Sequence, residues 1–187
     1  MRLIFQSSPQ HPPIAADEAT RAPSPIGCLG LATAGGFELV IVIFDTAVLR
    51  ERDAVVELCS VIKKNPHSRH LPVLALLQTP HRILIKSLED AGVEFVRIYE
   101  AGALEEEASF MELIRYPDES ERIERMFSRL CPFLNYSPIG RRREMMTCGA
   151  YRNRMVLGPA MLRPFCEVPD HVRCLYYNDP KPAKKRP

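Results

Sequence analysis

The 187-residue sequence predicts an α/β fold with a parallel sheet of about five strands. Residues 38–45 (ELVIVIFD) and 71–77 (LPVLALL) are nearly continuous apolar runs, which are typical of strands covered on both faces. Amphipathic helices are predicted after these runs, at 50–64 and 80–91. Strands that alternate with helices through short loops form parallel sheets with right-handed crossovers.

The remaining elements of the first hundred residues are shorter. Residues 1–5 and 93–98 are predicted as the first and last strands of the series. Residues 26–32 are predicted as a second strand. The segment 6–25 is rich in Pro, Ser and Ala, and only 14–21 within it could form a short helix.

Charge divides the chain into two parts. From Cys131 to the end there are 11 Lys or Arg and 4 Asp or Glu, whereas the remainder has 14 basic and 19 acidic residues. Such an asymmetry suggests two units with different partners. We therefore predict an α/β domain at 1–102, a helical linker at 103–130, and a small, irregular, α-rich module at 131–187.

Residues 37–98 resemble the receiver domain of bacterial response regulators. The matching pieces are ELVIVIFD, AVVELCSVIKKNPHSRHLPVLALL and LEDAGVEFVRI. The resemblance implies a flavodoxin-like sheet. It also implies phosphoryl transfer to an Asp at the end of the third strand, where an acidic pair holds Mg²⁺ and a hydroxyl residue and a Lys stand at neighbouring strand ends.

The phosphorylation site of that family is incomplete in this sequence. Asp45 is the candidate phosphoacceptor, although it stands one or two residues past the usual position. Residues 6–8 (QSS) replace the acidic pair, Leu77 stands at the hydroxyl position, and Ile98 stands at the Lys position. We therefore interpret Asp45 as a strand-end residue that caps the next loop or helix, and the domain as a pseudo-receiver that serves as an interaction scaffold.

The main candidate site is a set of four cysteines within the C-terminal module. These cysteines lie in Pro-interrupted segments with few large apolar residues, so we expect the module to need a metal as a staple. Cys28 and Cys59 lie in apolar elements and are interpreted as buried core residues. The four candidates, separated by 16, 17 and 7 residues, are Cys131, Cys148, Cys166 and Cys174.

The spacing favours an iron–sulfur cluster, [4Fe–4S], over Zn²⁺. Structural zinc sites pair ligands two to four residues apart, and no such pair occurs here. Thiolates on separate loops can instead surround a larger cluster, and Arg152, Arg154, Arg163 and Arg173 could offset its negative charge. Three alternatives stay open: the metal is zinc, the cysteines do not act together, or His171 replaces one cysteine as a ligand.

No catalytic set stands out in the sequence, so we expect a non-enzymatic regulatory or redox-sensing protein. The pseudo-receiver domain would bind a protein partner, either a signalling protein or a second copy of itself. The alternative is a zinc-stabilised nucleic-acid-binding adaptor that uses the basic C-terminal unit. The longest apolar run, 39–44, is far shorter than the roughly 20 residues that span a membrane, so we expect a cytoplasmic protein.

Overall fold

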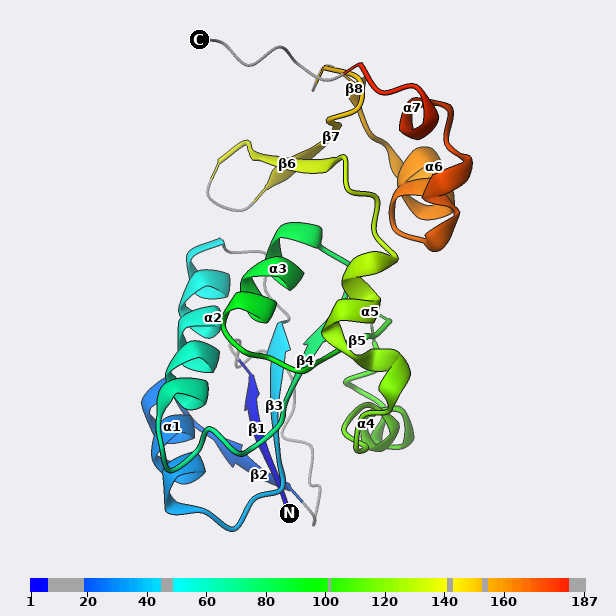
Figure 1. Ribbon diagram of the computed structural model, residues 1–187. Coiled ribbons are helices and arrows are strands. Elements are labelled where there is room, and N and C mark those ends of the chain that lie inside the picture. The colour runs from blue at the N-terminus through cyan, green and yellow to red at the C-terminus, as the bar shows by residue number, and fades with distance from the viewer. Residues whose placement is uncertain (7–18, 45–48, 101, 141–142, 153–154, 182–187) are drawn as a thin grey trace, which may run out of the picture.

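The computed structural model describes residues 1–6, 19–44, 49–100, 102–140, 143–152 and 155–181. Its central feature is a five-stranded parallel sheet with the strand order β2-β1-β3-β4-β5 (Figure 1). This order is compatible with a flavodoxin-like fold. The strands are β1 (Arg2–Gln6), β2 (Ala19–Ala22), β3 (Leu39–Phe44), β4 (Val73–Leu77) and β5 (Phe95–Ile98).

Four of the five strands confirm the sequence predictions, and the second strand corrects one. The sequence predicts a strand at 26–32, but these residues lie in the helix α1 (Pro25–Ala34). The strand beside β1 is instead β2, which pairs with β1 in parallel and overlaps the segment 14–21 proposed as a helix.

Local signals explain why α1 is a helix. Ser24 caps it, because its Oγ accepts a hydrogen bond from the N–H of Gly27 at 3.0 Å, and Pro25 occupies the first turn. Cys28 and Ala32 are one helical turn apart, and both are buried against the sheet. The sequence PIGCLGLATA is almost uniformly apolar and small, so it has no polar period that separates a helix from a strand.

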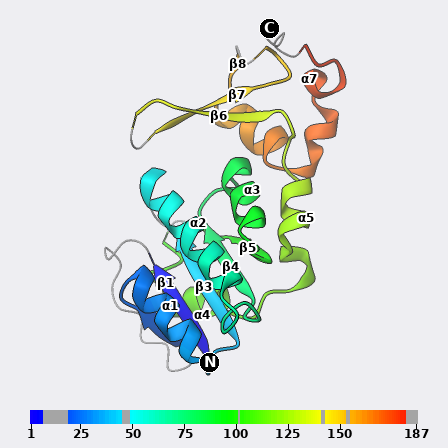
Figure 2. The ribbon, with the colours of Figure 1, turned by 60° about the vertical axis from the view of Figure 1, so that its left-hand side comes forward.

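Helices cover both faces of the sheet (Figures 1 and 2). Alternate β3 side chains define the two faces, with Val40 and Val42 on one and Leu39 and Ile41 on the other. The Val40 face packs against α1 and three further helices, whereas α4 (Glu107–Leu113) supplies Phe110 to the opposite core. The three further helices are α2 (Leu49–Lys64), α3 (Arg82–Asp90) and α5 (Ile123–Ser128).

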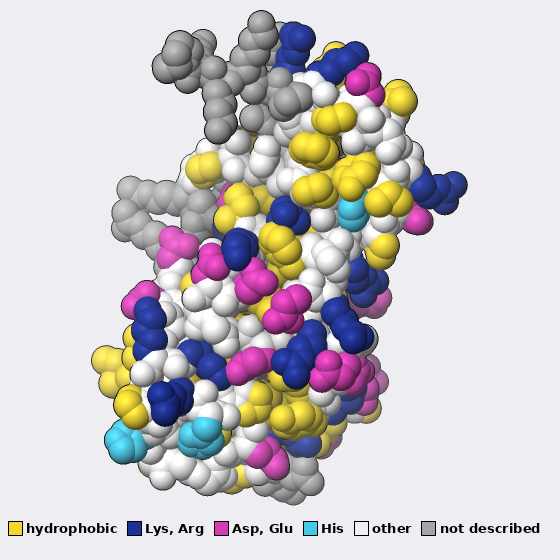
Figure 3. Space-filling model, viewed as in Figure 1, with side chains coloured by type: hydrophobic (Ala, Val, Ile, Leu, Met, Phe, Trp, Pro, Cys, Tyr) yellow, Lys and Arg dark blue, Asp and Glu magenta, His cyan; other side chains and the backbone are white. Residues whose placement is uncertain are grey.

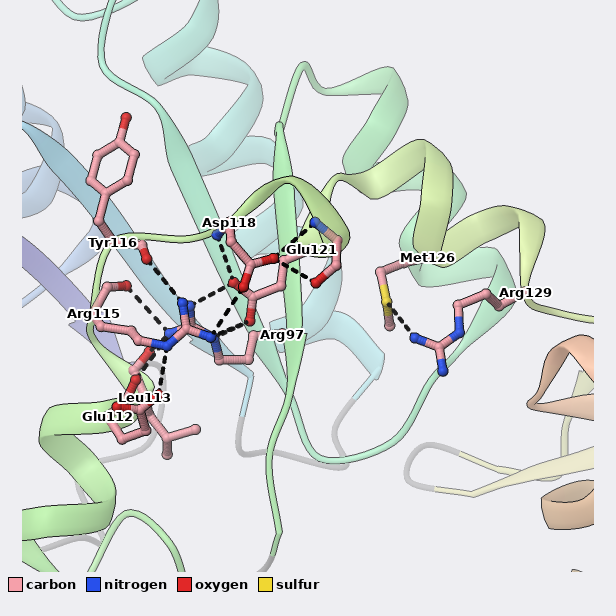
Figure 4. Close-up of polar contacts among 10 residues, drawn as sticks. Arg97, Glu112, Leu113, Arg115, Tyr116, Asp118, Glu121, Met126 and Arg129 are labelled. Carbon is pink, nitrogen blue, oxygen red and sulfur yellow. Dashed lines mark hydrogen bonds and ion pairs between the residues drawn. The ribbon is translucent and has the colours of Figure 1, made fainter.

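A buried arginine joins the sheet to the segment that follows it (Figure 4). Arg97 on β5 is 7% exposed, and its Nε and Nη2 donate to the two carboxylate oxygens of Glu121, the second at 2.7 Å. Its Nη1 donates to the backbone oxygens of Glu112, Leu113 and Arg115. Glu121 ends the short helix η1 (Glu119–Glu121), so this cluster fixes the chain between α4 and α5.

The C-terminal part contains a second sheet that the sequence does not predict. Strands β6 (Leu134–Pro138), β7 (Glu144–Cys148) and β8 (Met155–Val156) form an antiparallel sheet in that order. The α-rich interpretation of 131–187 is therefore wrong for its first half. Within the described residues after β8 lie four short helical turns, namely α6 (Pro159–Met161), η2 (Leu162–Cys166), η3 (Pro169–Arg173) and α7 (Leu175–Asn178).

Two further predictions concern the linker at 103–130 and the absence of a membrane-spanning segment. Helices α4 and α5 lie within the predicted linker 103–130 and are short. No helix within the described ranges is long and apolar enough to cross a membrane. The division of the chain at 102 and 130 stays a prediction.

Candidate metal centre

The four C-terminal cysteines lie in four separate segments of the chain, and all are free thiols. Cys131 follows α5, Cys148 ends β7, Cys166 ends η2, and Cys174 lies between η3 and α7. The first three are each 7% exposed, and Cys174 is half-buried. They are thus distributed over the whole C-terminal part, as their sequence spacing requires.

Backbone hydrogen bonds bring the first three cysteines together. The N–H of Cys131 donates to the carbonyl of Cys166 at 2.9 Å, which joins the end of the linker to η2. The N–H of Leu134 donates to the carbonyl of Cys131 at 3.1 Å, and Leu134 is also the register partner of Cys148 across β6 and β7. Segments that are distant in sequence therefore meet at these thiols.

Burial is the main influence on the acidity of two of these thiols. Burial raises the pKa of Cys166 to about 12, and negative charge on Cys131, Cys148 and Cys174 adds to this effect. Burial also raises the pKa of Cys131, with further contributions from Cys148 and Cys174. The buried thiols of Cys131 and Cys166 are therefore harder to ionise than those of exposed cysteines.

The thiols lie in a small apolar core that the sequence does not suggest. Its partly buried members include Phe133 and Tyr177, whose rings are 5.9 Å apart and edge to face. The expectation that this part has few residues for a core needs correction, although three of its seven buried members are cysteines. The buried members are Cys131, Leu134, Cys148, Ala150, Leu157, Leu162 and Cys166.

His171, the possible substitute for one cysteine, is buried. Its Nδ1 lies 2.9 Å from the carbonyl oxygen of Val168 and 3.2 Å from that of Arg129, and its ring packs edge to face on Tyr177. Because both partners of Nδ1 are acceptors, Nδ1 carries a proton. The ring thereby joins η3 to the end of α5, and its role as a substitute ligand stays untested.

Arg82 on α3 carries a positive charge near Cys131, and the sequence does not indicate it. Its Nη1 donates to the carbonyl of Leu130 at 3.2 Å, and its positive charge opposes the burial that raises the pKa of Cys131. The proposed arginines Arg152, Arg163 and Arg173 are exposed, and Arg154 lies outside the described residues. Arg82 stands 49 residues before Cys131, so neither spacing nor local composition indicates this contact.

A second polar cluster joins the C-terminal sheet to the helices. Glu144 on β7 accepts from Nη2 of Arg52 at 2.8 Å and from Nε2 of His81 at 2.9 Å. His81 caps α3, because its Nδ1 accepts the N–H of Leu84 at 3.1 Å, so Nε2 carries the proton that bonds Glu144. Burial lowers the pKa of His81, although Glu144 opposes this. The imidazole therefore acts here as a neutral donor.

This junction lies at the carboxyl edge of the parallel sheet. Tyr136 on β6 stacks on His81 with ring centroids 3.7 Å apart, and its Oη accepts the backbone N–H of Arg82 at 3.1 Å. A cavity of about 470 Å³ opens beside the pair, between the ends of β3 and β4 and the C-terminal part. Its lining includes Phe44, Leu77 and Glu167.

The register of the strands tests the positions expected from receiver domains. Phe44 on β3 pairs with Leu77 on β4, which in turn pairs with Ile98 on β5. Side chains without hydroxyl or amino groups therefore occupy this row at the carboxyl edge. Asp45, the candidate phosphoacceptor, directly follows Phe44 but lies outside the described residues.

Comparisons and ligand geometry together limit the interpretation of the site. No protein-family model matches the sequence, and no curated protein matches it either. Among the described residues, which include all four cysteines, no three His, Cys, Asp or Glu side chains form a group able to hold one metal ion. A zinc ion with sulfur bonds of about 2.3 Å requires its four sulfurs to lie within about 4 Å of one another.

Proposed function

We propose that the four cysteines bind a [4Fe–4S] cluster and that the protein is a non-enzymatic, redox-sensing regulator. One observation carries this proposal. Three of the four thiols, those of Cys131, Cys148 and Cys166, lie in one buried core, and the charges of Cys131, Cys148 and Cys174 all contribute to the pKa of Cys166, which burial chiefly raises. A cluster is larger than one ion, and cysteine thiolates are its ordinary ligands.

The chemistry of the surroundings supports the same choice of cofactor. Aromatic and aliphatic side chains pack around Cys131, Cys148 and Cys166, and apolar surroundings of this kind tune the potential of a cluster. Arg82 supplies a positive charge beside Cys131, which a net-anionic cluster would favour. Zinc remains the alternative metal, provided that the sulfurs draw together when it binds.

The α/β part is proposed as a pseudo-receiver that binds a protein partner. The sheet order supports a receiver-like arrangement, whereas the row from Phe44 to Ile98 has no group suited to phosphoryl transfer. Hydrophobic side chains gather over the C-terminal part, and charges of both signs cover the part below (Figure 3). Val172 and Leu175 are exposed on either side of Cys174, so an apolar partner surface would lie next to the cluster.

The cluster would control how the C-terminal part covers the carboxyl edge of the sheet. Glu144 and Tyr136 belong to the strands that end near the thiols, and they contact Arg52, His81 and Arg82 on the helices. If the cluster is lost, the strands lose one of their supports and these contacts weaken. A partner that binds this surface would therefore bind differently when the cluster is present and when it is lost.

Serine substitutions test the proposal. Cys131→Ser, Cys148→Ser, Cys166→Ser and Cys174→Ser are each expected to abolish or strongly reduce absorbance near 400 nm in anaerobically purified protein, because serine replaces a thiolate ligand. Cys28→Ser makes the same chemical change in the core of the α/β part and is expected to leave the absorbance intact. Equal absorbance in all five variants, or equal loss in all five, would contradict the proposal.

A further inference from the structure

The cavity at the carboxyl edge of the parallel sheet has the size and the place of a small-molecule site. It measures about 470 Å³, and its lining contains none of the four C-terminal cysteines. Sites for small molecules commonly measure about 300–1,000 Å³. In open α/β sheets they lie outside the carboxyl ends of the strands, which is where this cavity opens.

Apolar side chains from both parts of the chain form much of the lining. Phe44 and Leu77 are buried register partners at the ends of β3 and β4. Met146 on β7 and the buried Leu162 on η2 face the same space from the C-terminal part. These surfaces suit an apolar side chain of a ligand.

Four charged side chains also line the cavity, and two of them are paired with each other. Glu144 accepts from Nη2 of Arg52 at 2.8 Å and from Nε2 of the neutral His81 at 2.9 Å. Arg163 and Glu167 differ, because neither side chain takes part in a hydrogen bond or an ion pair within the described ranges. The cavity therefore offers one cation and one anion to a ligand.

These two charges lie about one helical turn apart on the same element. Arg163 belongs to η2, and the N–H of Glu167 donates to the carbonyl of Leu162 at 3.0 Å, so Glu167 lies directly at the end of η2. Arg163 is exposed and Glu167 is half-buried, so a ligand can reach both from solvent. The free charges are balanced, and each would repel a ligand of its own sign.

We propose that this cavity binds a free α-amino acid with an apolar side chain. The carboxylate of the ligand accepts from the Arg163 guanidinium, and its ammonium group donates to the Glu167 carboxylate. Both are charge-assisted hydrogen bonds, which are the stronger kind. The ligand's side chain lies against Phe44 and Leu77. This binding goes beyond the proposed function and requires no metal.

Isothermal titration calorimetry of the full chain, purified anaerobically, tests the proposal. L-leucine, L-methionine and L-phenylalanine are each compared with the acid that lacks the amino group and the amine that lacks the carboxylate. For leucine these analogues are isocaproate and isoamylamine. We expect at least one amino acid to bind with a Kd about tenfold or more below that of either analogue. Absence of binding for all three, or equal affinity for an analogue, overturns the inference.

Two variants assign the charges. Glu167→Gln is expected to remove the advantage of the amino acid over the acid, and Arg163→Gln its advantage over the amine. Asp170→Asn and Arg173→Gln change the same kinds of side chain on η3, outside the cavity lining, and should leave the Kd within about twofold of wild type. Unchanged preferences in both cavity variants, or equal losses in the two controls, overturn the inference.

The same titration separates this inference from the proposed function. Amino-acid binding by protein that holds no cluster supports the cavity site while the proposed function fails. A protein that holds a cluster and binds none of the three amino acids overturns the cavity site alone.

Discussion

Replacing Arg97 by Met is expected to lower the free energy of unfolding by about 3–5 kcal/mol. The substitution leaves the Glu121 carboxylate, whose side chain is 13% exposed, without the guanidinium that bonds both of its oxygens. It also removes the donor shared by three backbone carbonyls at the end of α4. Urea unfolding monitored by circular dichroism measures the change.

Two companion variants show whether burial is the reason. Lys86→Met removes ion pairs to Glu89 and Asp90, but Lys86 is exposed, so its effect is expected to stay below about 1 kcal/mol. The double variant Arg97→Met with Glu121→Leu is expected to recover part of the loss, because no buried charge is then left unpaired. Equal effects of Arg97→Met and Lys86→Met would contradict the importance of this pair.

The contribution of Glu121 depends on pH in a predictable direction. Burial opposes ionisation, but the hydrogen bonds from Arg97 and from the Asp118 N–H outweigh it, so the folded pKa lies below the ordinary value of 4.5. A lowered folded pKa contributes stability above the unfolded pKa, and this contribution is lost as the pH falls through the folded value. The difference between wild type and Arg97→Met should therefore be full at pH 7 and shrink below pH 4.5.

If the four cysteines bind the proposed cluster, its removal is expected to unfold the C-terminal part while the parallel sheet persists. Binding of a structural metal contributes directly to folding, and three of the seven buried residues in the C-terminal core are cysteines. Hydrogen exchange reports this locally through the amides of Cys131 and Leu157, which donate to the carbonyls of Cys166 and Met146. After iron is removed with a chelator, their protection should fall by about a hundredfold or more.

The amides of β3 and β4 serve as the internal control for that experiment. Residues Val40 to Ile43 are fully buried between two layers of helices, and the register of β3 with β4 does not involve the C-terminal part. Their protection should change by no more than about twofold. Unchanged protection at Cys131 and Leu157 after iron removal would show that apolar contacts alone hold the C-terminal part.

The sequence predicts a strand correctly where an apolar run is long and has polar residues at its end. The prediction fails where the apolar run lacks these limits. ELVIVIFD and LPVLALL have the length of strands and end at polar residues, so β3 and β4 lie where the prediction places them. In α1, the deciding features are the Ser24 cap and the spacing of Cys28 and Ala32. The cap depends on a single hydrogen bond, and the burial of Cys28 and Ala32 depends on which face of the helix the sheet covers. Neither can be predicted from the periodicity of apolar residues.

The sequence likewise predicts some features of the candidate site and misses others. The clustering of four cysteines in a Pro-rich segment can be recognised in the sequence, and the structure places three of them, Cys131, Cys148 and Cys166, in one buried core. The contact of Arg82 and the burial of His171 were missed because they come from tertiary contacts with Leu130 and Arg129. The strands β6 and β7 were missed because each is five residues long and half-exposed, without clear alternation.

Iron and sulfide analysis of anaerobically purified, full-length protein tests the central claim most directly. The proposal predicts about four iron atoms and four sulfides per chain, with absorbance near 400 nm. One zinc per chain in colourless protein, or protein with neither metal, would contradict it.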